Sequence, residues 1–287
     1  MQKETVRIAH SPDSDDAFMF YALATDKIES NDFRFVHELR DIESLNRLAL
    51  NGEYEITAVS IHAYAYLHKG YALLNSGASM GDGYGPRVVS RASFGPEELR
   101  GKRVAVPGER TSAFLALKLL QPDIESLVVP FDEIIACVKA GTVDAGVVIH
   151  EGQLTYRDHD LHKVVDLGEW WKQETGLPLP LGGNAIRRDL GAEKIQRLAG
   201  RLEASIRFAL DNREEALNYA LQFGRGLDSE NADRFISMYV NDRTLDYGEE
   251  GRQAVQLFLD RGYEAGLIPD RVKVDFVRPE LSDCRRR

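Results

Sequence analysis

The sequence predicts an α/β fold with two lobes, each an open mixed sheet flanked by helices, and a ligand cleft between them. The first observation is length: 287 residues exceed one average domain and allow two hydrophobic cores. The second is a strand, turn and helix plan that begins near Val6 and again near Arg103. The third is a helical pattern over 189–266, after the second unit.

The two halves begin alike. Val6–His10 predicts a strand, 11–14 a turn with capping residues, and Asp15–Thr25 a helix. Arg103–Val106 and Thr111–Leu120 repeat this strand and helix in the second half. Each half is therefore expected to start an open α/β sheet.

The correspondence continues with a second helix and strand in each half. Ile42–Leu50 and Asp132–Lys139 are predicted helices that end before glycine, and Glu55–Ser60 and Asp144–Ile149 are the strands that follow. Ligands of open α/β sheets bind beyond the carboxyl ends of the strands. Four loops should therefore converge on one cleft: His10–Asp16, Ser60–His62, Pro107–Ser112 and His150–Glu151.

The lobe boundaries follow from this plan. The helices of 189–266 are expected to pack on the first lobe, with buried positions such as Leu198, Ile206 and Phe258. The chain should cross between lobes near Ser90–Arg91 and near Asn184–Arg187. The larger lobe is thus predicted as 1–90 with 186–287, and the smaller lobe as 91–185.

Composition excludes several classes of function. A net charge of -10 and a pI near 5.3 argue against nucleic acid or an anionic membrane as the main partner. The start of the chain lacks a signal-peptide pattern, and no apolar run approaches the roughly 18 residues of a membrane span, so a cytoplasmic protein is expected. Cys137 is interpreted as a small core residue and Cys284 lies in a polar tail, so no structural disulfide is expected.

Two loops carry side chains suited to chemistry. Thr111 and Ser112 open a helix, where free N–H groups favour a carboxylate or phosphate, although they could simply cap it. His150 ends an apolar strand and could act as a base near neutral pH, although such a histidine is often structural. Glu151 is a poor candidate to orient it, because adjacent strand residues face opposite ways.

A metal site is a competing hypothesis. His62 with Asp13, Asp15 and Asp16 offers imidazole and carboxylate ligands, but without a metal-specific spacing. Asp15 and Asp16 are more simply acids of a first helical turn, favoured by the helix dipole. The prediction is therefore no metal.

Two further segments have open interpretations. The glycine-rich run Gly81–Pro86 suits either a ligand-binding or hinge segment or a tight surface turn. Trp170 and Trp171 could line a pocket for an aromatic ligand or support the junction of the lobes.

Several segments spread over nearly the whole chain carry a resemblance to a known family. They are Gly85-Pro86 before Val88-Val89, Val106-Pro107-Gly108 before Thr111, Ile149-His150-Glu151, 166–171, 175–182, and Tyr239-Val240-Asn241 before 248–251. In these the chain resembles the 1,4-dihydroxy-6-naphthoate synthases of the futalosine route to menaquinone, whose fold is that of type II periplasmic binding proteins.

The resemblance implies a reaction and a site. Such a lyase opens the spiro-fused ring of cyclic dehypoxanthine futalosine, releases a sugar-derived fragment and needs no cofactor. His150 aligns with the family's proposed base, Thr111 and Ser112 would hold the substrate carboxylate or hydroxyls, and Ser60 would line the pocket from the other lobe. The remaining residues expected at the substrate are Ser11, Asp16, His62 and Gly85. The expected partner is a small carboxylated aromatic substrate, and the sequence allows a homodimer.

One segment departs from the family pattern. The family opens with Ser-Pro-Cys-Pro-Asn-Asp, whereas this chain keeps only Ser11, Pro12 and Asp16 of it, and His62 stands where a small residue is expected. The substrate could therefore be a relative of the expected one. Two alternatives remain open: chorismate dehydratase of the same route, and a protein that binds a small acid without altering it.

Overall fold

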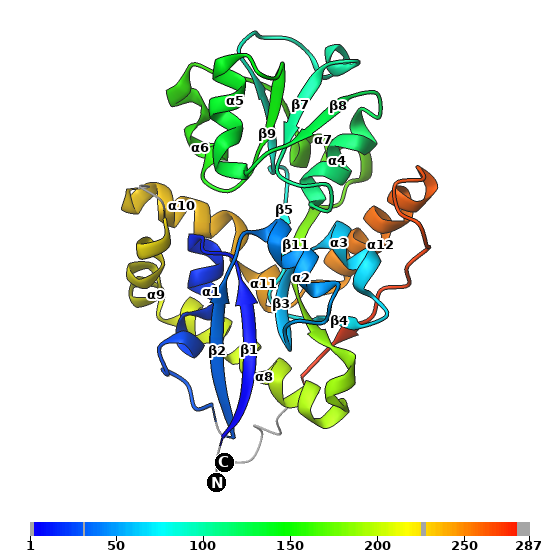
Figure 1. Ribbon diagram of the computed structural model, residues 1–287. Helices are drawn as coiled ribbons and strands as arrows, with labels where there is room; N and C mark the ends of the chain where they lie inside the picture. The colour runs from blue at the N-terminus through cyan, green and yellow to red at the C-terminus, as the bar shows by residue number, and fades with distance from the viewer. Residues whose placement is uncertain (1–2, 31, 225–227, 280–287) are drawn as a thin grey trace.

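The computed structural model describes residues 3–30, 32–224 and 228–279, and these residues form two lobes, each built on one sheet (Figure 1). In the described part of the chain the larger sheet has seven strands in the order β12-β4-β11-β3-β1-β2, with β5 also paired to β11. Their bounds are β1 Glu4–His10, β2 Phe33–Leu39, β3 Ile56–Ser60, β4 Tyr71–Leu74, β5 Ser79–Gly81, β11 Leu179–Arg187 and β12 Phe276–Val277.

Helices from both ends of the chain cover the larger sheet (Figure 1). The longest, α8, contributes Leu198, Leu202 and Ile206 to a core shared with Phe18 and Phe20 of α1. The predicted packing of the late helices on the first lobe is thereby confirmed. The helices of this lobe are α1 Ser14–Ala24, α2 Ile42–Ala49, α3 Ile61–Leu67, α8 Ala192–Asp211, α9 Arg213–Ala220, α10 Ser229–Tyr239, α11 Asp242–Leu245 and α12 Gly248–Glu264.

The smaller sheet has five strands in the order β10-β6-β9-β7-β8. Its strands are β6 Arg87–Ser90, β7 Arg103–Val106, β8 Glu125–Val128, β9 Ala145–Val148 and β10 His162–Asp166. Four helices accompany it: α4 Ser112–Leu120, α5 Ile134–Ala140, α6 Gly152–Thr155 and α7 Leu167–Thr175.

The lobe boundaries differ from the predicted ones at both crossings. Strand β6 pairs with β9 and β10, so residues 87–90 belong to the smaller lobe and not to the larger one. Strand β11 pairs with β3, β4 and β5, so residues 179–185 belong to the larger lobe. The chain therefore crosses at 82–86 and again after α7, because sheet pairing, which hydrophobic pattern alone does not reveal, decides where a strand belongs.

The glycine-rich segment and the tryptophans lie at these crossings. A Cβ on Gly81 would lie 2.0 Å from the carbonyl oxygen of Tyr84, so the chain folds tightly on itself there. Trp171 is buried and meets Phe258 of α12 edge to face, with ring centroids 5.2 Å apart. Of the two interpretations of the tryptophans, support of the lobe junction holds for Trp171.

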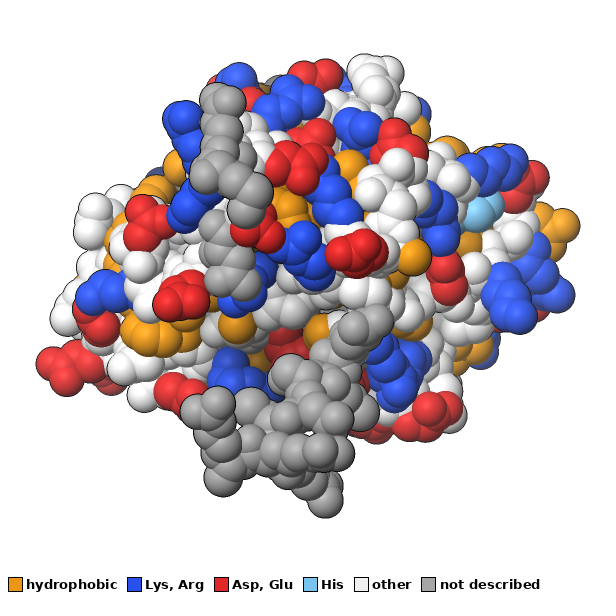
Figure 2. Space-filling view, turned by 90° about the horizontal axis from the view of Figure 1, so that it is seen from below, with side chains coloured by type: hydrophobic (Ala, Val, Ile, Leu, Met, Phe, Trp, Pro, Cys, Tyr) orange, Lys and Arg blue, Asp and Glu red, His pale blue; other side chains and the backbone are white. Residues whose placement is uncertain are grey.

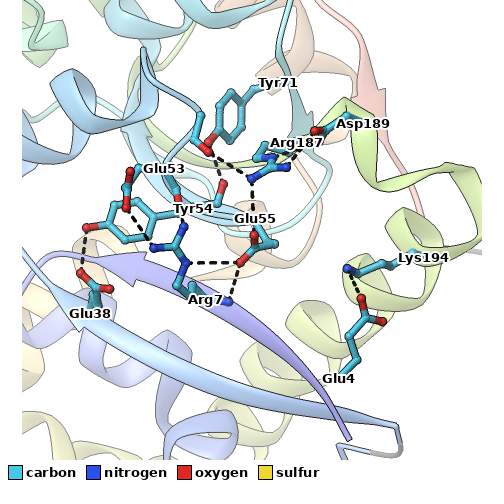
Figure 3. Close-up of polar contacts among 11 residues, drawn as sticks. Glu4, Arg7, Glu38, Glu53, Tyr54, Glu55, Tyr71, Arg187, Asp189 and Lys194 are labelled. Atoms are coloured by element: carbon cyan, nitrogen blue, oxygen red, sulfur yellow. Dashed lines mark hydrogen bonds and ion pairs between the residues drawn. The ribbon is translucent and has the colours of Figure 1, made fainter.

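A charged network secures the larger sheet away from the cleft (Figure 3). Arg7 of β1 pairs with Glu53 and approaches Glu55, while Arg187 of β11 pairs with Glu55 and Asp189. These ion pairs cross the strands β1, β3 and β11, and thus reinforce their order at the end remote from the cleft. Being partly exposed, each is worth only about 0 to 1 kcal/mol.

The outer surface carries charges of both signs. Figure 2 shows the lower face of the larger lobe, where Lys and Arg are interspersed with Asp and Glu. The described side chains on this face form no continuous basic stripe of the kind that binds nucleic acid. None of the helices in the described ranges is long and apolar enough for a membrane span. Cys137 is half-buried against a core cluster of the smaller lobe, as expected, and Cys284 lies outside the described residues.

Candidate functional site

A cavity lies where four strands end, as predicted. In the larger lobe β1 and β3 run parallel, with Ala9 opposite Thr57, and in the smaller lobe β7 and β9 run parallel, with Val104 opposite Ala145. The residues that follow these strands face one another across a space of about 740 Å³, open solvent at the mouth included.

The cavity brings together six of the residues that the sequence predicted for the site. Two more, Asp13 and Asp15, also line it, as do apolar side chains that include Met19, Ile149 and Phe235. The six predicted residues are Ser11, Asp16, Ser60, Thr111, Ser112 and His150.

Two predicted site residues are not part of the cavity lining. His62 is buried in α3 and points at the smaller lobe: its backbone N–H donates to Oγ of Ser112 at 3.2 Å, and its Nδ1 lies 3.3 Å from the carbonyl oxygen of Thr111. A helix begins at Ile61, which turns His62 away from the end of β3. Gly85 precedes the lining residue Pro86, and a Cβ on Gly85 would lie 3.0 Å from the backbone nitrogen of Gly168.

The N-terminus of α4 forms one wall. Thr111 caps this helix, because its Oγ1 accepts from the N–H of Phe114 at 3.2 Å and donates to the carbonyl of Gly108 at 2.8 Å. The hydroxyl of Ser112 donates to the carbonyl of Leu181 at 2.5 Å. Both hydroxyls thus serve the fold, and the N–H groups of the first turn are what a bound anion would meet.

Ser60 is held by a residue that sequence reasoning missed. Asn46 of α2 is fully buried; its Oδ1 accepts from the Ser60 N–H at 2.9 Å and its Nδ2 donates to the Ser60 hydroxyl at 3.0 Å. A polar residue at an expected buried position of the helix 42–50 is the signal in the sequence that could have pointed to Asn46.

His150 reaches the cavity from the end of β9. Its backbone is left-handed, with φ of 50°, an uncommon conformation for a residue other than glycine. Its Nδ1 lies 2.9 Å from Oδ2 of Asp13, and its ring meets Phe131 edge to face at 5.0 Å. The partner of the imidazole is therefore Asp13 of the other lobe and not Glu151, in agreement with the doubt about Glu151 drawn from strand geometry.

Gln153 and Tyr239 support this corner and were not predicted. The Tyr239 hydroxyl lies 2.6 Å from the Gln153 side chain. With the amide turned to satisfy its neighbours, Gln153 donates to the carbonyl of Gly85 at 2.6 Å and accepts from the backbone N–H of His150 at 3.2 Å. The carbonyl of Gly85 therefore helps to hold Gln153, which in turn holds the backbone of His150.

Three carboxyl groups line the same wall with different protonation. Burial raises the pKa of Asp13, but the charge of His150 and hydrogen bonds from His150 and Ser11 outweigh it and bring the pKa below its ordinary value. Burial and the charge of Asp13 raise the pKa of Asp15 well above its ordinary value and that of Asp16 to about 8. At neutral pH the wall thus carries one carboxylate, on Asp13, and two neutral acids.

Asp16 provides a test of this charge distribution. Between its ordinary value of 3.8 and about 8 the native Asp16 holds a proton that the unfolded chain has lost, so stability falls as pH rises through this window. Asp16→Asn cannot ionise and can still accept from the Ser11 N–H, which Asp16 does at 2.7 Å. We expect the free energy of unfolding of the variant, relative to that of the parent, to rise by roughly 3 kcal/mol from pH 5 to pH 8, as measured by urea unfolding. If the variant and the parent differ in free energy of unfolding by the same amount at pH 5 and pH 8, the pKa of Asp16 is not raised.

The arrangement is better described as a hydrogen-bonded pair than as a metal centre. Ligand atoms of Asp13, Asp15 and His150 lie within 4.8 Å of one another, and His62 does not belong to the group. Oδ2 of Asp13 and Nδ1 of His150 lie 2.9 Å apart, which is a hydrogen-bonding distance, and a cation bound there would take the place of the shared proton. The hypothesis of a metal held by His62 together with Asp13, Asp15 and Asp16 is therefore wrong, because His62 lies apart from these carboxyl groups.

Comparisons with known proteins identify the family of the chain. A family described as menaquinone biosynthesis matches residues 6–264. Two relatives carry the name 1,4-dihydroxy-6-naphtoate synthase. The one from Streptomyces coelicolor is 40% identical, with 94% of this chain and 96% of the relative covered. The one from Thermus thermophilus is 42% identical, with 96% and 100% covered.

Solved structures show the same fold. A crystal structure of an Archaeoglobus fulgidus protein is 49% identical, with a TM-score of 0.87 over 92% of this chain and 98% of that one. The alkanesulfonate-binding protein of Xanthomonas axonopodis pv. citri is only 14% identical but has a TM-score of 0.72 over 97% and 99% of the two chains, which shows the periplasmic-binding-protein fold alone. From the extent of the family match and of the two synthase relatives, the chain belongs to the menaquinone-biosynthesis family of the 1,4-dihydroxy-6-naphthoate synthases.

Proposed function

We propose that the protein converts cyclic dehypoxanthine futalosine into 1,4-dihydroxy-6-naphthoate, with His150 as the general base. The observation that carries the proposal is that His150 and the N-terminus of α4 line one cavity between the lobes. A base and an anion-binding helix end are the two features that deprotonation of a carboxylated substrate requires.

The walls suit the parts of such a substrate. The first-turn N–H groups of Ser112 and Ala113 would receive the ring carboxylate, since none of the described lining residues is Lys or Arg. Apolar side chains would flank the ring, and the polar residues Ser60 and Asn184 would face the sugar-derived part. The neutral acids Asp15 and Asp16 limit repulsion of the carboxylate.

The proposed reaction begins with the removal of one proton from the substrate. A base that takes a proton from a hydroxyl or a carbon of the substrate allows the spiro-fused ring to open, and carbon–carbon cleavage then releases the sugar-derived fragment. General base catalysis of this kind contributes roughly 10²–10⁴-fold. Contacts between the lobes, such as Ser112 to Leu181, would help to exclude water from the reaction.

The proposal is tested by incubating the purified protein with cyclic dehypoxanthine futalosine in the presence of a chelator and following dihydroxynaphthoate by chromatography. Saturable formation of the product is expected. Saturable binding without product would overturn the proposal and support the solute-binding alternative. Product formation that stops with the chelator and returns with a metal would overturn the cofactor-independent scheme.

A further inference from the structure

We propose that Asp13 is a positioning residue for His150, in an Asp–His pair that spans the two lobes and fixes which ring nitrogen acts as the base. As far as it concerns turnover, this inference rests on the proposed function. The pair itself is a property of the free protein and can be tested without substrate.

The geometry selects one tautomer. Oδ2 of Asp13 lies 2.9 Å from Nδ1 of His150, and the Asp13 side chain is 2% exposed. A carboxylate accepts hydrogen bonds only, so Nδ1 must carry the proton. In the neutral imidazole the lone pair is then on Nε2, which becomes the basic nitrogen of the ring.

Asp13 is itself held in place. Its Oδ2 also accepts from the Ser11 hydroxyl at 2.6 Å, and the Ser11 N–H is bonded to Asp16 at 2.7 Å. The turn that follows β1 therefore fixes the carboxylate that fixes the imidazole. The left-handed backbone of His150 shows that the local structure directs this side chain at some energetic cost.

The surrounding charges leave Asp13 as the anion. Burial and neighbouring carboxylates keep the pKa of Asp15 and Asp16 raised, and Glu151 adds to the effect on Asp15. Burial, with His37, lowers the pKa of His10 to about 3, so His10 brings no positive charge to the turn. When His150 takes a proton from the substrate, the carboxylate of Asp13 would stabilise the imidazolium that forms.

The two members come from different lobes. Asp13 precedes α1 of the larger lobe, and His150 follows β9 of the smaller lobe. The pair can exist only while the lobes are in contact, as they are in this structure without substrate.

The test compares Asp13→Asn with the parent by ¹⁵N NMR of the histidine rings, with His150→Ala used to assign the signal. The parent is expected to show His150 with Nδ1 protonated, and Asp13→Asn a mixture of tautomers, because an amide can donate or accept. With substrate, kcat is expected to fall about tenfold to a hundredfold while KM changes little. Asp144→Asn, at the opposite end of β9, is the matched control and should leave both readouts unchanged.

Several results would decide the matter. An unchanged tautomer and an unchanged kcat in Asp13→Asn would overturn the proposal. A changed tautomer in a protein whose parent does not convert the compound would uphold the pair and refute only the proposed substrate. If Asp13→Asn does not fold, Ser11→Ala keeps the carboxylate but removes its hydrogen bond, and a smaller shift of the same sign is expected.

Discussion

The His150→Ala protein is expected to lose more than about a hundredfold in kcat while it stays folded. His150 is the imidazole that lines the cavity, and its removal leaves Asp13 without a base to orient. The substitution leaves the buried carboxyl of Asp13 without its partner, so a loss of stability is also expected, and uptake of a proton by Asp13 should limit it. The measurement is steady-state formation of product together with thermal unfolding.

The control for this variant is His162→Ala. His162 is an exposed histidine at the start of β10 in the same lobe, outside the cavity. It should retain full activity. Full activity of His150→Ala would remove His150 from the mechanism, and loss of folding would make the ring a structural residue.

The second large effect is expected for Gly168→Ala, which should destabilise the protein by about 3 kcal/mol or more. An added Cβ would lie 1.9 Å from the carbonyl oxygen of Tyr84 and 2.7 Å from the nitrogen of Gly85. These are backbone atoms of the first crossing, and they cannot rotate away as the end of a side chain can. The clash should lower the midpoint of thermal unfolding by roughly 6 °C or more.

The matched control is the same substitution in another helix. Gly200 lies in α8, where the one described atom within 4 Å of an added Cβ is Cβ of Pro279, at 3.8 Å. Alanine is favoured over glycine in a helix by about 0.5–1 kcal/mol, so Gly200→Ala should stabilise slightly. If Gly168→Ala unfolds at the same temperature as the parent, the close packing of α7 on the first crossing is wrong.

The repeat of strand, turn and helix was enough to predict the cleft. The expected strand Arg103–Val106 is β7, and the loops after β1, β3, β7 and β9 do meet. This worked because the carboxyl ends of parallel strands share one edge of a sheet. Ser11, Ser60, Thr111 and His150 were therefore placed at the cavity from sequence alone.

The lobe boundaries and the contacts that hold the site residues in place could not be predicted from the sequence. Whether β6 joins one sheet or the other depends on hydrogen bonds to β9 and β10, which lie far along the chain. The pairing of Asp13 with His150 joins residues 137 positions apart in different lobes (150 − 13). His62 was misplaced because the helix begins directly after β3, a boundary that pattern does not fix to one residue.

The most direct test of the account is a crystal structure of the His150→Ala protein with cyclic dehypoxanthine futalosine bound. The substrate is expected between the lobes, with its carboxylate on the backbone N–H groups of Ser112 and Ala113 and its reacting hydroxyl or carbon beside position 150. A substrate bound outside this cavity, or one whose carboxylate points away from α4, would contradict it.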